Sequence, residues 1–428
     1  MKTFLKMIPK LAVVVALSAI AGFLLLILVY LLPTASMEEN VAASVEIFRR
    51  EGTYPVTDIM GVDTRLDNYT DALMLLSASY PGEENALEKA LKVYRYTDAS
   101  NTDPAMALIA HYGDGVEASS IAYERYWHGY LLTLKPALSI LDYGQIRMLN
   151  AFMLSLCTLW LLSLMYKMGG RNYIPPLLLS LLMLDPLAIA RSLQYSTIYY
   201  VSILSSSLML LRLEWLKEAR DRLPLFFAAV GCAASFFDLL TWPLASFGIP
   251  FCLLLCMDNS HFEKKLCLLF VCLASWFVGY GGMWAGKWII AAVFGDAGAI
   301  RTALTIAFFR SSMADEAGYA FSCLDVTARN LAHLISPATM AAAIYVLAVA
   351  VALGRKRGGL RGWFADGRWN FAPLAVLALL PFLWYLAVGN HSYVHHWFTY
   401  RTLVVSAFAI LCIFPLPMPI CRKPMQKP

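Results

Sequence analysis

The sequence has few charged residues. Asp, Glu, Lys and Arg make up 15% of its 428 residues, against about 25% in ordinary soluble domains. It also lacks a glycine-rich nucleotide loop, a low-complexity tract and an internal repeat. Apolar residues account for 59% of the chain, and the mean hydropathy is +0.61. These values exclude a disordered chain, a coiled coil and a nucleic-acid-binding protein, argue against a soluble enzyme and predict an integral membrane protein.

The nine cysteines do not follow the pattern of a secreted disulfide framework. Only Cys323 and Cys421 fall in segments that we expect to be aqueous. The other seven lie in apolar runs, where a thiol packs as a small hydrophobic side chain: Cys157, Cys232, Cys252, Cys256, Cys267, Cys272 and Cys412. We therefore predict no disulfide bond.

Ten apolar runs approach the length of about 20 residues that a membrane-spanning helix needs. The first, Leu11 to Leu32, follows three lysines and is longer than the apolar core of a signal peptide, so we interpret it as an uncleaved anchor. Nine further spans are predicted at Ile146–Tyr166, Tyr173–Ala190, Ile198–Trp215, Leu223–Leu240, Pro243–Met257, Leu266–Trp284, Pro337–Leu353, Phe371–Val388 and Thr402–Pro417. The least secure are the proline-containing Tyr173–Ala190 and the short Pro243–Met257.

The predicted fold is an all-α polytopic membrane protein with about ten transmembrane helices and a helical extracytoplasmic cap. Residues 1–32 form the anchor, and residues 33–145 form the cap, which holds 17 of the 29 acidic residues. Residues 146–284 carry helices two to seven, and residues 285–336 form an amphipathic segment along the outer interface. Residues 337–428 contain the last three helices and a basic tail.

The distribution of Lys and Arg predicts the orientation in the membrane. With the N-terminus in the cytoplasm, more than half of the 34 basic residues fall in short inside segments, as the positive-inside rule requires. We therefore expect a multi-pass protein of the plasma membrane with both termini in the cytoplasm.

Three acids in the cap form the first candidate site. Asp67 and Asp71 are four residues apart and would share a helix face, and Asp63 would extend the row or cap the helix. Mutual repulsion raises the pKa of one acid in such a row, which suits a general base. The alternative is a capped surface helix with solvated carboxylates.

Two short segments form further candidates on the same side of the membrane. Arg125, Trp127 and His128 belong either to an interfacial aromatic belt or to the wall of a substrate cavity. Arg191 and Gln194 lie in a short outer turn, where a basic residue opposes the positive-inside trend. Arg191 therefore needs an anionic partner, either a ligand or Asp185.

The last candidate site lies before the final span and contains His391, His395, His396, Tyr400 and Arg401. Arg401 would sit at the depth of the lipid headgroups, where its planar guanidinium suits a phosphate or pyrophosphate. The alternatives are a snorkelling Arg beside an aromatic belt and a metal site built from two histidines and an acid. No ligand spacing of the HExxH type supports the metal.

The layout resembles the GT-C superfamily of glycosyltransferases, polytopic enzymes that take a sugar from a polyprenyl-phosphate carrier. The resemblance rests on one span followed by a long acidic loop, on the many later spans, and on the segments Leu66-Asp67-Asn-Tyr-Thr-Asp71-Ala-Leu-Met, Tyr126-Trp127-His128-Gly129-Tyr130 and Asn390-His391-Ser-Tyr-Val-His395-His396-Trp-Phe-Thr-Tyr400-Arg401. It implies that Asp67 or Asp71 activates the acceptor, with Asp63 in reserve, and that Arg401 holds the carrier phosphate. The acidic motif lies farther from the first span than is usual in the superfamily, which leaves the choice among the three acids open.

The expected partners are the lipid bilayer, a polyprenyl-phosphate-linked sugar donor and a glycan, lipid or protein acceptor. No cofactor is required, and the use of a divalent metal ion stays open. The alternatives are a polymerase or ligase of lipid-linked glycans, a transporter of such glycans and a non-catalytic membrane protein. Nearly charge-free spans without a repeat argue against transport.

Overall fold

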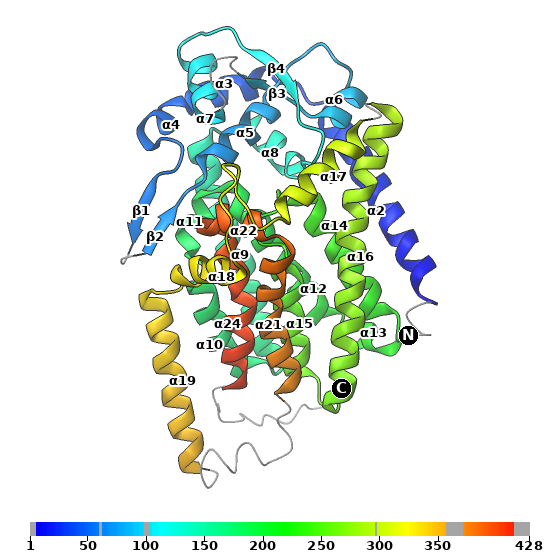
Figure 1. Cartoon of the computed structure of the whole chain (residues 1–428), viewed down its shortest axis with the longest axis vertical. Helices are drawn as coiled ribbons and strands as arrows, with labels where there is room; N and C mark the ends of the chain where they lie inside the picture. Colours follow the sequence, from blue (N-terminus) through cyan, green and yellow to red (C-terminus); the bar gives the residue numbers. More distant parts are fainter. Residues whose placement is uncertain (1–5, 60–61, 98–102, 296–297, 357–370, 415–428) are drawn as a thin grey trace, which may run out of the picture.

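Four helices in the described part of the chain are long and apolar enough to cross a membrane. The computed structural model describes residues 6–59, 62–97, 103–295, 298–356 and 371–414. The four are α2 (Ile8–Val29), α9 (Tyr143–Lys167), α16 (Phe262–Phe294) and the segment His396–Ile413, which joins α23 (His396–Thr399), the 3-10 turn η3 (Tyr400–Leu403) and α24 (Val404–Ile413). A fifth is added if α18 (Cys323–Ala332) and α19 (Pro337–Lys356), which meet at 90°, count as one broken span. The architecture fits an all-α membrane protein (Figure 1).

The expectation of ten full-length spans is not met in the described residues. The run Tyr173–Ala190 breaks at Asp185, whose φ of 55° lies in the left-handed region, and Pro186 starts a new helix. The remaining segments are shorter than a full span or, in α12, rich in Ser, Thr and Tyr. They are η2 (Arg171–Tyr173), α10 (Ile174–Leu182), α11 (Pro186–Arg191), α12 (Leu193–Leu211), α13 (Leu213–Glu218), α14 (Arg222–Phe237), α15 (Ala245–Met257) and α21 (Ala372–Ala387).

Helices α14 and α16 pack closely through glycine. A Cβ atom on Gly279 would lie 2.0 Å from the carbonyl oxygen of Ala228, and one on Gly231 would lie 2.2 Å from that of Trp276. Any larger residue would push the backbones apart, as at other helix contacts built on small residues. Helix α16 also runs ten residues beyond the predicted span end at Trp284. The predicted boundary at residue 285 therefore falls inside a helix, and the amphipathic segment begins instead with α17 (Ala299–Arg310).

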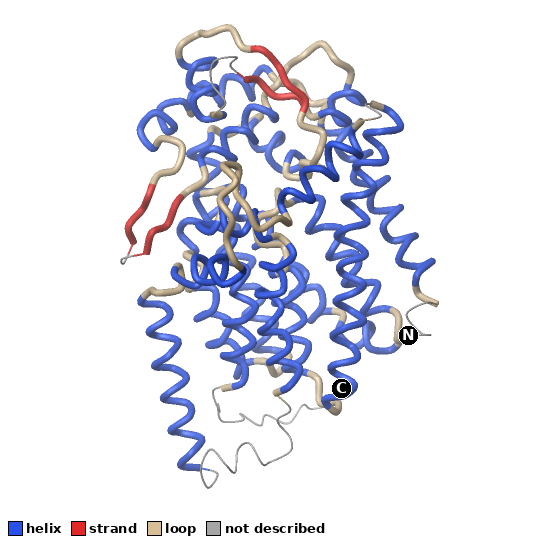
Figure 2. Tube along the Cα trace, in the orientation of Figure 1, coloured by secondary structure: helices blue, strands red, loops and turns tan. Residues whose placement is uncertain are grey.

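The cap, residues 33–145, is mostly helical, but it also contains two antiparallel strand pairs that were not expected (Figure 2). Strand β1 pairs with β2, and β3 pairs with β4. Its elements are α3 (Ala35–Ala43), α4 (Val45–Glu51), β1 (Val56–Ile59), β2 (Val62–Arg65), α5 (Asn68–Ala78), α6 (Ala86–Lys92), β3 (Tyr94–Thr97), α7 (Pro104–Leu108), the π-helical turn η1 (Ile109–Gly113), β4 (Ser119–Ala122) and α8 (Leu131–Leu138).

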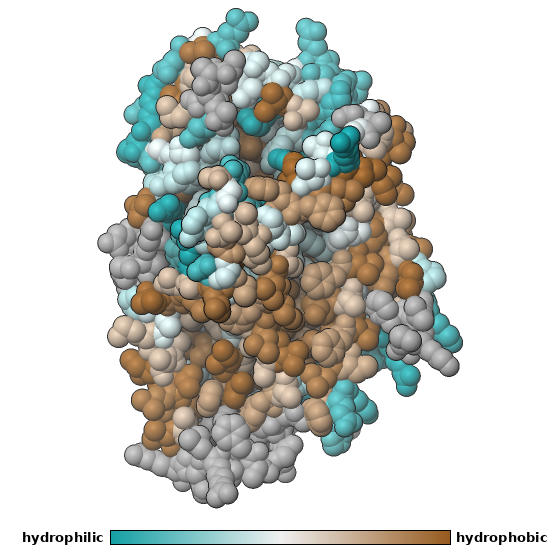
Figure 3. Space-filling view, in the orientation of Figure 1, coloured by the Kyte–Doolittle hydropathy of each residue, from teal (hydrophilic) through white to brown (hydrophobic). Residues whose placement is uncertain are grey.

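The cap is joined to the bundle through a shared apolar core and buried lysines. Leu26 and Val29 of α2 belong to the same buried cluster as Phe48 and Leu75 of the cap. The Lys287 ammonium of α16 donates 2.7 Å to the carbonyl oxygen of Leu91. Figure 3 shows hydrophilic residues over the cap and hydrophobic residues over most of the helices below it. The predicted basic loop at residues 357–370 and the basic tail after residue 414 lie outside the described residues.

Candidate functional site

Asp71 connects three elements at the base of the cap. Its buried carboxylate accepts hydrogen bonds from the Tyr143 hydroxyl (2.5 Å) and from the backbone N–H groups of Leu193 (2.9 Å) and Gln194 (3.1 Å). These two N–H groups are at the start of α12 and have no partner within that helix. Asp71 therefore caps α12 from a different helix. Burial raises the pKa of Asp71, and the Tyr143 hydrogen bond opposes this.

Asp67 lies one turn earlier, and within the described residues its carboxylate bonds only to its own turn. It caps α5 by accepting from the Thr70 N–H (2.9 Å) and the Thr70 hydroxyl (3.1 Å). Its backbone N–H donates to the Ser192 hydroxyl at 3.1 Å. Burial raises the pKa of Asp67 to about 7, and the Asp71 charge adds to this. A carboxyl group that titrates near neutral pH suits a general base.

Asp63 does not join these two acids on the helix. It lies in β2, where it pairs with Asp58 of β1. The predicted row of three acids on one helix is therefore wrong at Asp63, because the chain is extended there.

Sequence reasoning missed an ion network beside Asp71. The Arg147 guanidinium donates to both Glu51 oxygens (3.0 and 2.9 Å) and to the Asn68 side-chain oxygen (2.8 Å). Asn68 in turn donates to Glu51 at 3.2 Å. Although burial opposes it, the charge of Arg147 holds the pKa of Glu51 below its usual value. The sequence contained one signal of this network, because Arg147 is a charged residue at the second position of the predicted span Ile146–Tyr166.

Arg191 joins this network rather than pairing with Asp185. Its guanidinium donates to Glu51 at 3.1 Å and its side chain is 43% exposed. Asp185 instead caps α11 by accepting from the Ala188 N–H. Gln194 is buried, and its side-chain oxygen has no hydrogen-bond partner among the described residues.

Arg401 is completely buried rather than set at an exposed surface. Its Nε donates to the Leu184 carbonyl oxygen (3.0 Å) and its Nη1 to that of Trp397 (3.1 Å). The guanidinium lies 4.2 Å from the Tyr195 ring centroid and 4.9 Å from that of Tyr400. Its Nη2 has no hydrogen-bond partner within the described ranges. A buried donor without a partner is costly, so this N–H is an unsatisfied polar group in the interior of the protein.

The histidines near Arg401 bond to separate partners. His391, in α22 (Gly389–Val394), accepts from Arg310 at Nδ1 (2.6 Å) and donates to the Leu240 carbonyl oxygen from Nε2 (2.6 Å), so neither nitrogen is open to a metal ion. Burial lowers the pKa of His391 and that of His395, the latter to about 3. His396 contacts His333 at 2.7 Å. These contacts argue against the alternative of a metal site built from His391, His395 and an acid.

The side chains of the aromatic segment before α8 pack closely inside the protein. Trp127 is buried and donates 2.7 Å to the Met283 carbonyl oxygen of α16. His128 has a φ of 56° and bonds to the Tyr123 carbonyl oxygen (2.7 Å) and the Tyr130 hydroxyl (2.9 Å). Burial lowers the pKa of His128 to about 3. The guanidinium of Arg125 lies 5.2 Å from the Tyr123 ring. The Trp127 bond joins the cap to α16, whereas the contacts of His128 and Arg125 lie within the cap. The nearby Tyr130 also lines a cavity.

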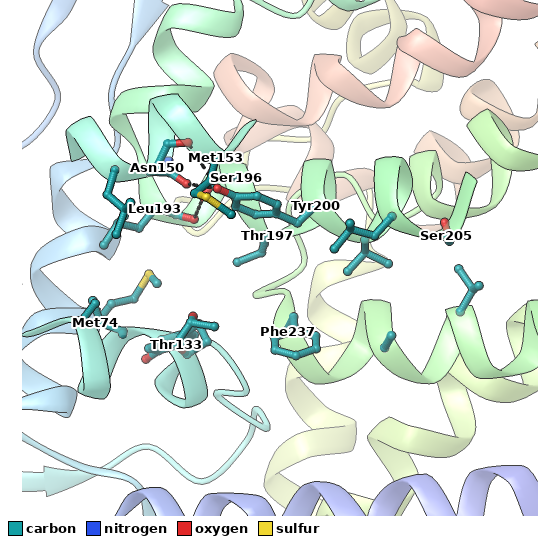
Figure 4. Close-up of a pocket in the computed structure, with 18 of the residues that line it drawn as sticks. Met74, Thr133, Asn150, Met153, Leu193, Ser196, Thr197, Tyr200, Ser205 and Phe237 are labelled. Carbon is teal, nitrogen blue, oxygen red and sulfur yellow. Dashed lines mark hydrogen bonds between the residues drawn. The ribbon is translucent and has the colours of Figure 1, made fainter. Parts of the chain in front are cut away.

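That cavity is an apolar groove of about 680 Å³ between the cap, α9, α12 and α14 (Figure 4). It extends from Leu193 to Leu208 along α12, a length of about 22 Å at 1.5 Å per residue. The lining residues Leu149, Leu204 and Leu208 are 43, 42 and 50% exposed, so the groove opens to the side of the bundle. Its polar lining groups gather near the cap and include Asn150, Ser196, Thr197 and Tyr200 (Figure 4).

The groove and the acids meet at the start of α12. Leu193 lines the groove, and its N–H binds Asp71. The preceding residue, Ser192, accepts from the backbone of Asp67. Comparison of the chain with protein-family profiles, with curated proteins and with solved structures found no match to any of them.

Proposed function

We propose that this protein is a membrane glycosyltransferase of the GT-C kind, which moves a sugar from a polyprenyl-phosphate carrier to a glycan, lipid or protein acceptor. The observation that carries the proposal is the apolar groove, which is open to the side and reaches Leu193, whose backbone N–H binds the buried Asp71, one turn from Asp67. A carrier with a long hydrocarbon chain needs such a groove, because its apolar tail must stay out of water while its headgroup reaches polar residues.

Asp67 is the proposed general base. The acceptor hydroxyl oxygen attacks the anomeric carbon of the sugar, the bond from that carbon to the phosphate oxygen breaks, and the hydroxyl proton passes to the Asp67 carboxylate. Its pKa of about 7 keeps a large ionised fraction near neutral pH. Asp71 is less suited to this role, because three donors from other elements already occupy its carboxylate.

Arg401 is the proposed phosphate-binding residue. The departing carrier phosphate gains negative charge, and a guanidinium N–H stabilises that charge. Support comes from Nη2, which lacks a protein acceptor among the described residues. Tyr195 contacts both Arg401 and the segment that leads into Asp67. Its ring faces the guanidinium, and its hydroxyl donates to the Arg65 carbonyl oxygen at 3.0 Å.

The proposed orientation follows the positive-inside rule, with both termini in the cytoplasm and the cap outside the plasma membrane. In a background with Cys267, Cys323 and Cys421 replaced by Ala, single cysteines placed at the exposed cap residue Glu117 and at the exposed Lys264, in the first turn of α16, would test it. A membrane-impermeant maleimide applied to intact cells should label the cap cysteine alone. Labelling of position 264 alone would reverse the orientation.

A transfer assay in liposomes with a polyprenyl-phosphate hexose tests the chemistry. We expect Asp67→Asn to reduce kcat by about 10²–10⁴-fold. The matched control is Asp142→Asn, because Asp142 also caps a helix, α9, but lies outside the site. Native mass spectrometry of the wild type should detect the bound monophosphate carrier, and Arg401→Ala should lose it.

The carrier identity separates this function from the alternatives. A bound polyprenyl-pyrophosphate glycan would move the assignment to a polymerase or ligase. Full transfer activity of the Asp67→Asn and Arg401→Ala variants would contradict both site assignments. If native mass spectrometry detects only bulk phospholipid, in equal amounts on the wild type and on Arg401→Ala, then Arg401 is not the phosphate-binding residue.

A further inference from the structure

Three thiols converge where α15 packs against α24, at the end of the bundle away from the cap (Figure 1). Cys252 and Cys256 are four residues apart on α15 and therefore share a face, and Cys412 lies on α24. The three sulfur atoms lie within 4.8 Å of one another. All three are free thiols; Cys252 and Cys412 are buried and Cys256 is partly exposed.

Polar residues lie beside the exposed side of this thiol cluster. Helix α15 ends at Met257, and the next residue, Asp258, pairs with Lys217 at 3.3 Å. The ammonium of Lys265 donates 3.0 Å to the Leu255 carbonyl oxygen and acts electrostatically on Cys256. Lys265 therefore offsets negative charge on the sulfur atoms when they are ionised.

Packing alone accounts for single buried thiols but not for the convergence of three. A buried cysteine behaves as a small hydrophobic residue, as Cys272 does on α16. Three sulfur atoms bound to one ion at about 2.3 Å each would be about 4 Å apart. The observed limit of 4.8 Å is close to this value, so small side-chain rotations would complete the coordination.

We propose that Cys252, Cys256 and Cys412 bind one soft metal ion with a filled d shell, Cu(I) or Zn(II). Thiolate ligands favour these ions over the hard cations Mg²⁺ and Ca²⁺. Each sulfur–metal bond replaces an S–H bond, so binding releases up to three protons to the aqueous side. Cu(I) can be held by the three sulfur atoms alone, whereas Zn(II) needs a fourth ligand, such as a water molecule at the open side of Cys256.

Metal titration of the full-length protein in detergent tests the site. Replacing Cys267, Cys323 and Cys421 by Ala first removes thiols outside the cluster that would react or chelate. In that background we expect about one Cu(I) or Zn(II) per chain. Cys252→Ala and Cys412→Ala should each weaken binding by about 100-fold or more. Cys272→Ala is the matched control, since it removes a buried thiol outside the cluster and should leave binding unchanged.

Two results would overturn the proposal. One is the absence of stoichiometric binding of either ion to the background protein. The other is unchanged binding in the Cys252→Ala and Cys412→Ala double variant. If these variants fail to fold, alkylation of Cys256 in the background protein decides the matter, because a bound ion must slow the reaction with maleimide. An unchanged alkylation rate at saturating Cu(I) and Zn(II) would exclude the site. The readouts do not involve glycosyl transfer.

Discussion

Asp67 and Asp71 are one turn apart at the start of α5, yet their carboxylates accept hydrogen bonds from different parts of the protein. Asp71 receives hydrogen bonds from Tyr143 of α9 and from Leu193 and Gln194 of α12. The Asp67 carboxylate receives both of its hydrogen bonds from Thr70, within the same turn. A carboxylate bonded to several elements stabilises the fold, whereas one bonded only locally is available for chemistry at small structural cost.

The two buried arginines differ in the kind of partner that they bind. Arg147 is paired with the Glu51 carboxylate through two hydrogen bonds and with Asn68 through a third, and its Nε has no partner among the described residues. Arg401 bonds to two backbone carbonyl oxygens and keeps one amino group without a partner among the described residues. Under the proposed function, Glu51, Arg147 and Asp71 hold the structure, whereas Asp67, Tyr195 and Arg401 are the side chains that would meet the substrate.

The largest expected effect comes from Asp71→Ala. The change leaves the N–H groups of Leu193 and Gln194 and the Tyr143 hydroxyl buried without an acceptor, at about 1–3 kcal/mol for each group. We expect a loss of roughly 3–5 kcal/mol in the free energy of unfolding. Thermal unfolding of the purified protein in detergent measures it. An Asp71→Ala variant as stable as the wild type would remove the structural role of this acid.

A smaller loss is expected for Glu51→Gln, which keeps the shape but removes the charge. Arg147 would then lose its closest acidic partner, and its two hydrogen bonds to residue 51 would no longer join opposite charges. We expect a loss of roughly 2–3 kcal/mol. Because the pKa of Glu51 is lowered in the folded protein, its contribution is present above the pKa of the unfolded chain and is lost as the pH falls. The difference in free energy of unfolding between the wild type and Glu51→Gln, measured across pH 3–7, should therefore be largest near pH 7.

Asp67→Asn should change stability with the opposite dependence on pH. The folded pKa of Asp67 is about 7, against about 3.9 in an unfolded chain. The folded protein binds the proton more tightly, so this contribution is full below about pH 4 and is lost as the pH rises through 7. Asn is as good a helix cap as Asp. We therefore expect equal stability at pH 4 and a more stable variant at pH 8.

The pH dependence of transfer activity is a second test of Asp67. Transfer by the wild type should fall as the pH drops below about 7, because the base becomes protonated. The Asn variant should be inactive throughout that range. A variant that loses activity and also unfolds more easily at pH 8 would place Asp67 with Asp71 on the structural side.

The sequence predicted the first span, the α9 span and the last span close to their observed positions. Each is a continuous apolar run, and such a run in water or lipid has few alternatives to a helix. The middle of the chain was harder, because α10, α11, α14 and α15 are also apolar but are short and contribute residues to one shared core. Hydropathy measures the apolar character of a residue and not whether lipid or protein surrounds it.

The candidate site was only partly predictable for a different reason. The sequence identified Asp67, Asp71 and Arg401 by residue type and by the resemblance. It could not pair Glu51 with Arg147, because the partners are 96 residues apart and meet only after folding. Nor could it separate Asp67 from Asp71, since their difference depends on the position of α12 relative to α5.

The smallest expected effect is that of Arg191→Ala, which sharpens the comparison within one ion network. Arg191 and Arg147 bind the same carboxylate of Glu51, but their side chains are 43% and 8% exposed. Water screens the exposed pair, so we expect a loss of about 0–1 kcal/mol, with transfer close to that of the wild type. Thermal unfolding and kcat/KM measured on the same preparation test both parts. A marked fall in kcat/KM at unchanged stability would make Arg191 a carrier-binding residue and would extend the proposed site to Glu51.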